Sequence, residues 1–165
     1  MSSLFAHHVQ SEQQHVPDEE HSPEWSTPRH VFDPLNQEFG FDLDVCASDG
    51  NAKCDRYFTR SDDGLQQDWG RSRCWMNPPY GRGLLEQWLA KALESSRNGA
   101  FVVALLPVDT STDWWHNYVV HAELRFRHGR IKFGGASGSP RFANVVAIFW
   151  PRCSCCGSVL REART

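Results

Sequence analysis

The segment Asn77-Pro78-Pro79-Tyr80 holds the residue types in this sequence that are best suited to chemistry. An amino group on an aromatic ring is a poor nucleophile, because its lone pair is delocalised into the ring. The Asn77 side-chain oxygen and the Pro78 backbone oxygen can each accept one N–H and draw that lone pair out of conjugation, while the Tyr80 ring stacks on the acceptor. The prolines fix φ and remove backbone donors, and Pro79 shapes the turn. The segment predicts transfer of a methyl group to an exocyclic nitrogen; an ordinary turn is the alternative.

The apolar residues around this segment predict the elements that position it. Periodic spacing predicts helices, and alternating or continuous apolar runs predict strands. The expected helices are 28–39, capped by Ser26 or Thr27, 84–97 and 111–121. The expected strands are 41–46, 56–59, 74–76, 100–106, 144–150, and a hairpin of 123–127 with 130–133. This alternation predicts an α/β fold with an open, mostly parallel sheet flanked by helices, in which ligands bind beyond the carboxyl ends of the strands.

The chain has 165 residues, enough for one domain with a continuous core. We expect a polar, disordered N-terminal tail over 1–24, a folded domain over 25–151, and a tail over 152–165. No apolar run approaches the roughly 20 residues of a membrane span, so we expect no membrane partner and an intracellular, soluble protein. The six cysteines have irregular spacing and are expected to be free thiols, without a metal site.

Charge is distributed unevenly along the chain. Residues 1–28 contain five acids and no Lys or Arg, whereas residues 121–165 contain eight Lys or Arg and two acids. The last third can therefore attract phosphate, although a solvated basic surface is the alternative. The residues expected to contact nucleic acid are Arg125, Arg127, Arg130, Lys132 and Arg141. Trp114 and Trp115 are expected to be core residues rather than wedges between bases.

Several separated motifs, in one order, resemble those of the phage-type DNA adenine-N6 methyltransferase family. They are Thr27-Pro28, Leu43 to Ala47, Asp63-Gly64-Leu65 with Asp68-Trp69, Trp75 to Gly81, Leu106-Pro107 with Asp109-Thr110, Trp114 to His116, and Gly129 to Phe133. The resemblance covers residues 25–150. It implies a compact Rossmann-like methyltransferase fold, S-adenosylmethionine as the methyl donor, and a flipped adenine in double-stranded DNA as the acceptor. It also implies a phage or prophage origin and action in the cytoplasm of a bacterial host, and nothing indicates an obligate protein partner.

The resemblance also assigns roles to individual residues. Asn77, Pro78 and Tyr80 match the catalytic segment. The residues that match methyl-donor positions are Thr27, Pro28, Asp44 and Ala47, with Asp63 and Asp68 as weaker matches. Asp44 can instead cap the turn that follows it.

The chain departs from the wider methyltransferase pattern after the first strand. The usual glycine-rich turn is replaced by residues 47–51, in which Gly50 is the only glycine, and little sequence remains for a crossover helix before Asn77. Two other readings stay open at this point. One is a methyltransferase that acts on RNA or on a protein glutamine, and the other is a catalytically silent DNA-binding relative.

Overall fold

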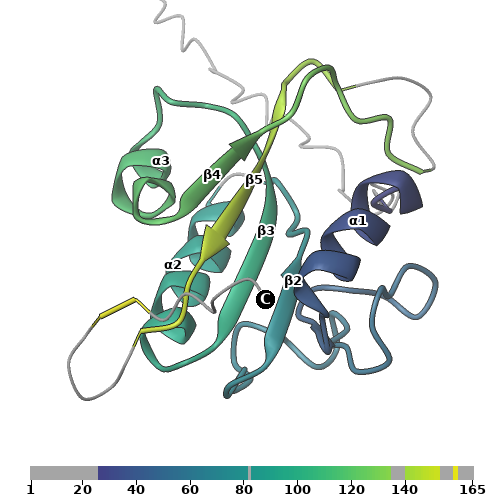
Figure 1. The fold of residues 1–165 in the computed structure, drawn as a ribbon, viewed down its shortest axis with the longest axis vertical. Coiled ribbons are helices and arrows are strands. Elements are labelled where there is room, and N and C mark those ends of the chain that lie inside the picture. Colours follow the sequence, from purple (N-terminus) through teal and green to yellow (C-terminus); the bar gives the residue numbers. More distant parts are fainter. Residues whose placement is uncertain (1–25, 82, 135–139, 153–157, 160–165) are drawn as a thin grey trace, which may run out of the picture.

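A computed structural model of the protein describes residues 26–81, 83–134, 140–152 and 158–159 (Figure 1). Its elements, in chain order, are α1 (Arg29–Phe39), β1 (Leu43–Asp44), β2 (Arg73–Met76), α2 (Leu84–Arg97), β3 (Phe101–Pro107), α3 (Asp113–Asn117), the 3-10 helix η1 (Val119–His121), β4 (Glu123–Phe126) and β5 (Asn144–Phe149). The predicted tail 1–24 and most of the predicted tail 152–165 lie outside the described residues. None of the described helices is long and apolar enough to cross a membrane.

The strands form one five-stranded sheet in the order β1-β2-β3-β5-β4. β1, β2 and β3 are parallel, and β5 is antiparallel to both of its neighbours. The carboxyl ends of β1, β2, β3 and β4 therefore lie at the same edge of the sheet, with the amino end of β5. The predicted α/β class, an open sheet flanked by helices, is confirmed.

Side chains alternate along the central strand β3 and divide the core into two layers. Val102, Ala104 and Leu106 pack in a cluster with side chains of α2 and α3. Val103 and Leu105 pack in a second cluster with side chains of α1. Helices thus cover both faces of the sheet, as the separate positions of α1 and α2 in Figure 1 show. The continuous apolar run that predicted this strand is explained by burial on both faces.

The helix predicted over 84–97 is confirmed as α2. The prediction that Ser26 or Thr27 caps the first helix is wrong, because Pro28 takes the N-cap position in an extended conformation. α1 continues through Pro34 and ends at Gly40, whose φ of 60° places it in the left-handed region that glycine adopts readily.

The predicted hairpin of 123–127 with 130–133 is wrong. β4 covers the first of these segments, but it pairs with β5. Ile131 and Phe133 instead bury their side chains in the cluster around α1, on the face of the sheet that α1 covers. β5 is buried along its whole length and gains a hydrogen-bonded neighbour on each edge in this way.

Three other predicted elements are shorter than expected. The strand over 41–46 is reduced to β1, and the segment 56–59 contributes only a single bridge, between Tyr57 and Asp44. The helix over 111–121 is divided into α3 and η1 at Tyr118. No helix lies between β1 and β2, where every residue is described, although 28 residues separate the two strands.

Candidate active site

The segment Asn77-Pro78-Pro79-Tyr80 follows β2 directly and lies at the edge where the parallel strands end. Asp44 is the last residue of the neighbouring strand β1. The register of the two strands pairs Asp44 with Trp75, so Asn77 lies two residues beyond that pair. Ligands of open α/β sheets bind at this edge, and the topology alone therefore places Asp44 beside the segment that carries Asn77.

A narrow pocket joins them. Three of its lining residues were predicted from the sequence, namely Thr27 and Asp44 for the methyl donor and Asn77 for catalysis. The remaining lining residues are Ser26, Cys46, Asn51, Lys53 and Trp75. The enclosed volume is about 20 Å³, room for little more than one water molecule. Residues from four separate segments of the chain thus meet at one point.

Asp44 supplies a buried carboxylate to this pocket. It is 4% exposed, and its oxygens accept backbone N–H groups from Lys53 at 3.1 Å and from Cys46 at 3.4 Å. Burial raises its pKa to about 6, against the opposing effects of those two N–H groups and of the Lys53 charge. A cation or a hydroxyl group that binds to this buried carboxylate stabilises its ionised form.

Thr27 supplies an unsatisfied hydroxyl. Its side chain is 2% exposed, and Oγ1 has no hydrogen-bond partner among the described residues. A buried hydroxyl without a partner is destabilising by about 1 to 3 kcal/mol, so a ligand that bonds to it recovers that free energy. Pro28, predicted beside it, is the N-cap of α1 and does not line the pocket.

Ala47 does not line the pocket, but its backbone helps to hold the turn that does. Its N–H donates to the Phe58 carbonyl at 2.9 Å, which fixes the start of the turn after β1. Asn51 and Lys53, later in the same turn, are the residues that reach the pocket. These two residues, like Cys46 and Trp75, were not among the site residues predicted from the sequence. For Asn51, the available signal was its position in the turn over 47–51, which stands where a glycine-rich loop is usual.

Tyr80 and Asn77 are linked by a hydrogen bond. The Tyr80 hydroxyl lies 3.2 Å from Asn77 Oδ1 and 3.1 Å from the Leu105 carbonyl oxygen, and it can donate to either. Burial, and then the nearby Cys46, raise the pKa of the phenol, so it stays protonated. The ring meets Phe142 edge to face at a centroid distance of 5.6 Å. The amide of Asn77 is therefore oriented by a neutral donor three residues ahead in the same segment, which also contacts the backbone of β3.

The other two residues of the segment differ in exposure, since Pro78 is buried and Pro79 is exposed. The predicted catalytic roles of all four residues stay predictions.

Asp63 and Asp68 do not line the pocket; both are exposed and bond to backbone N–H groups two residues ahead. The motif around them has a packing explanation. A Cβ on Gly64 would lie 2.2 Å from the Val45 carbonyl oxygen, and the Trp69 indole N–H donates to the Gly64 carbonyl at 2.9 Å. Their assignment to the methyl donor remains a prediction.

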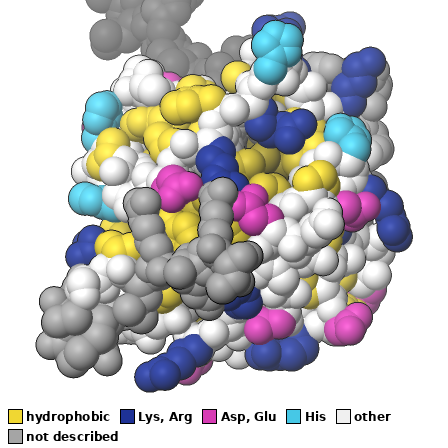
Figure 2. Space-filling view, in the orientation of Figure 1, with side chains coloured by type: hydrophobic (Ala, Val, Ile, Leu, Met, Phe, Trp, Pro, Cys, Tyr) yellow, Lys and Arg dark blue, Asp and Glu magenta, His cyan; other side chains and the backbone are white. Residues whose placement is uncertain are grey.

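Four of the five predicted nucleic-acid contacts are exposed. Arg130 and Lys132 alternate with the buried Ile131 and Phe133, so their positions on the surface are fixed by the core. Arg127 and Arg141 are also exposed. On the face shown in Figure 2, Lys and Arg side chains lie apart from one another, among acidic and uncharged groups.

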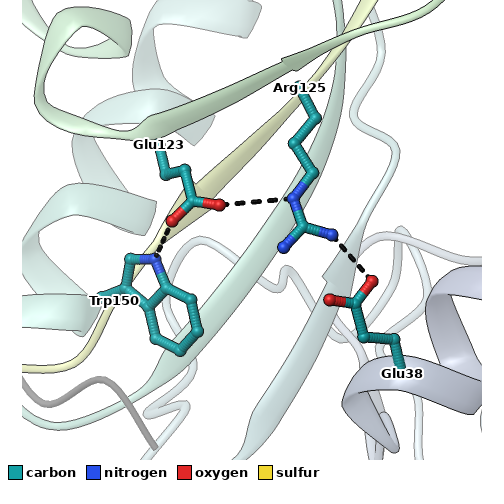
Figure 3. Close-up of polar contacts among 4 residues, drawn as sticks. All are labelled: Glu38, Glu123, Arg125 and Trp150. Carbon is teal, nitrogen blue, oxygen red and sulfur yellow. Dashed lines mark hydrogen bonds and ion pairs between the residues drawn. The ribbon is translucent and has the colours of Figure 1, made fainter. Parts of the chain in front are cut away.

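Arg125, the fifth, is held within the protein (Figure 3). Its guanidinium contacts Glu38 at 2.7 Å and Glu123 at 3.3 Å, and it lies 5.0 Å from the centre of the Phe39 ring. Glu123 also accepts the Trp150 indole N–H at 3.0 Å. The hydrogen bond to Glu38 raises the Arg125 pKa. Its proposed contact with nucleic acid would have to compete with these partners.

The aromatic side chains in this region are divided between core and surface. Trp115 is buried and Trp114 packs against the same core cluster, which agrees with the expectation that they are core residues. Phe126, at the end of β4, is 70% exposed.

Comparisons with known proteins identify the family of this chain. The sequence profile of the family described as DNA N-6-adenine-methyltransferase (Dam) matches residues 13–147. A DNA N-6-adenine-methyltransferase of Haemophilus phage HP1 is 39% identical over 114 residues, which are 66% of this chain and 65% of that protein. The corresponding protein of Escherichia phage T1 is 37% identical over 93 residues, 55% of this chain and 38% of that protein.

A putative methyltransferase of Escherichia coli, YfdM, is 38% identical over 64 residues, 34% of this chain and 70% of that protein. The matched part of this chain spans less than two thirds of the length of either phage relative. The family profile covers most of the chain, including β1, β2, β3 and the segment that carries Asn77. The chain belongs to the DNA N-6-adenine-methyltransferase (Dam) family.

Proposed function

We propose that this protein transfers a methyl group from S-adenosylmethionine to the N6 amino group of adenine in double-stranded DNA. The observation that carries the proposal is the pocket in which Asn77 meets Thr27 and Asp44, in a chain that belongs to this family. The relatives from two phages support action in the cytoplasm of a bacterial host.

The residues of the pocket fit S-adenosylmethionine, which supplies an electrophilic methyl group on a sulfonium centre when it is bound. The buried Asp44 carboxylate would accept hydrogen bonds from an ammonium or a ribose hydroxyl. The Thr27 hydroxyl, which lacks a partner among the described residues, would gain one. Because the enclosed volume is about 20 Å³, a ligand of this size would extend beyond the pocket or displace its lining side chains.

On the acceptor side, Asn77 Oδ1 and the Pro78 carbonyl would each accept one N–H of the adenine amino group. An amide oxygen has two lone pairs, so Asn77 can accept from the amine while Tyr80 also donates to it. The amine becomes more acidic as the methyl group is transferred, and these two acceptors then bind it more strongly than before. The proton that leaves the nitrogen can pass to water.

The target base must leave the duplex to reach this pocket, because its amino group is paired within the helix. Exposed Arg127, Arg130, Lys132 and Arg141 would hold the phosphate backbone, and each phosphate contact makes binding weaker as salt rises. Phe126, which precedes Arg127 in the sequence, offers an exposed aromatic ring.

The experiment that tests the proposal is incubation of the full chain with radiolabelled S-adenosylmethionine and duplex DNA, followed by digestion and nucleoside analysis. We expect label in N6-methyladenine, and none with the Asn77→Ala variant. Parallel reactions with RNA and with a glutamine-containing peptide test the other acceptors. Label in either of these but not in DNA would refute the proposed substrate, and binding of both ligands without label would indicate a silent relative.

A further inference from the structure

The turn after β1 brings Lys53 to the pocket. The Asn51 side chain accepts the Ser48 N–H at 2.8 Å, and the N–H groups of Asn51 and Ala52 donate to the Ser48 carbonyl at 3.1 and 3.0 Å. The chain then returns to β1, where the Lys53 N–H donates to Asp44 Oδ2 at 3.1 Å. A turn closed by a side chain therefore stands where methyltransferase folds usually have a glycine-rich loop.

The ammonium of Lys53 has a neutral partner in this position. Nζ donates to Ser26 Oγ at 3.2 Å, across 27 residues of sequence, and both residues line the pocket. Among the residues that the structure describes, Lys53 forms no ion pair. Its charge lowers the Asp44 pKa by less than burial raises it. The pocket thus holds a cation and an anion that do not neutralise each other through a direct side-chain contact.

The amino-acid end of S-adenosylmethionine has the complementary pair of charges, an α-ammonium and an α-carboxylate on one carbon. A ligand of this kind can place its ammonium at Asp44 and its carboxylate at Lys53. Resting on the function proposed above, we propose that Lys53 binds the α-carboxylate of the methyl donor and that Asp44 binds the α-ammonium. The turn over 47–53 supplies by a charged side chain what a glycine-rich loop supplies by backbone N–H groups.

Two ligands separate this role from a purely structural one. Decarboxylated S-adenosylmethionine retains the ammonium, the sulfonium and the nucleoside but lacks the carboxylate. The experiment is titration calorimetry of both ligands with the wild type and with Lys53→Met, which gives the four dissociation constants. The wild type should prefer the carboxylated ligand, and Lys53→Met should weaken it roughly 10- to 100-fold, as for loss of a hydrogen bond between charged groups.

The same variant should not weaken binding of the decarboxylated ligand. It carries an extra net positive charge, so removal of Lys53 should leave its affinity unchanged or increase it. Lys53→Arg should restore most of the preference for the carboxylated ligand. Lys91→Met, on α2 and outside the pocket, is the matched control and should bind both ligands as the wild type does.

The outcomes are distinct. Equal weakening of both ligands by Lys53→Met, with an unchanged melting temperature, would mean that Lys53 only supports the site, and would overturn the assignment. Unchanged binding of both ligands would overturn it as well. A wild-type chain that binds neither ligand would refute the proposed function and, with it, this role of Lys53.

Discussion

Replacement of Asp44 by Asn should make the protein more stable at neutral pH while it weakens methyl-donor binding. Asp44 is 4% exposed, and burial raises its pKa to about 6 from an ordinary value of 3.8. A buried acid with a raised pKa holds its proton more tightly in the folded state than in the unfolded state. Stability is therefore highest when Asp44 is protonated and is lost as pH rises from about 4 to about 6.

The size of the effect follows from the shift. At 1.36 kcal/mol per pKa unit, ionisation of Asp44 in the folded protein costs about 3 kcal/mol above pH 6. Asn removes this cost, but its amide NH₂ must face one of the two backbone N–H groups that now bond to the carboxylate, which costs about 1 kcal/mol. The net gain at pH 8 should be about 2 kcal/mol, or a rise in melting temperature of about 4 to 8 °C for a chain of this length.

Urea unfolding of the wild type and of Asp44→Asn at pH 5 and pH 8 measures the effect, and titration calorimetry measures S-adenosylmethionine affinity. The wild type should lose stability between these two pH values, and the variant should lose much less. The variant should bind the methyl donor at least about tenfold more weakly, since a charged hydrogen bond is lost. Wild-type affinity should rise with pH through about 6, as the carboxylate forms. A variant that is less stable at pH 8 and keeps the wild-type pH dependence would refute this reasoning.

Four further predictions concern other parts of the chain, and the third of them compares two variants. Asn77→Ala should abolish methylation with methyl-donor affinity retained, and turnover close to normal would remove Asn77 from the catalytic group. Tyr80→Phe should lower the free energy of unfolding by about 1 kcal/mol and reduce turnover, because its hydroxyl bonds to the β3 backbone and to Asn77. Unchanged values of both would show that only the ring matters. Arg125→Ala should destabilise the fold by about 1 kcal/mol without altering the salt dependence of DNA binding. Arg130→Ala should leave stability unchanged and flatten the slope of log affinity against log salt concentration by about 1. The reverse pattern would exchange the roles of these two residues. Deletion of residues 1–22 should leave specific DNA binding intact in a gel-shift assay, and loss of binding would place DNA contacts in that segment.

The sequence alone determined the elements whose pattern is local. The spacing of Leu85, Trp88 and Leu89 defines one apolar face of a helix, and α2 has the predicted bounds. The continuous apolar runs became β3 and β5, both fully buried. The order of the short motifs was sufficient to identify the family, because each motif is a contiguous stretch of chain.

Only the tertiary structure decided which segments meet. Periodicity gives the buried face of a strand but not its neighbour, so β4 was assigned to residues 130–133 and pairs instead with β5. Arg125 was grouped with the other basic residues, because its partner Glu38 lies 87 positions away in the sequence. Lys53 gave no signal of its own, and its position beside Ser26 and Asp44 arises from the turn after β1 and the packing of α1 on the sheet. Long-range pairs of this kind depend on the arrangement of elements in space, which no local pattern of residues encodes.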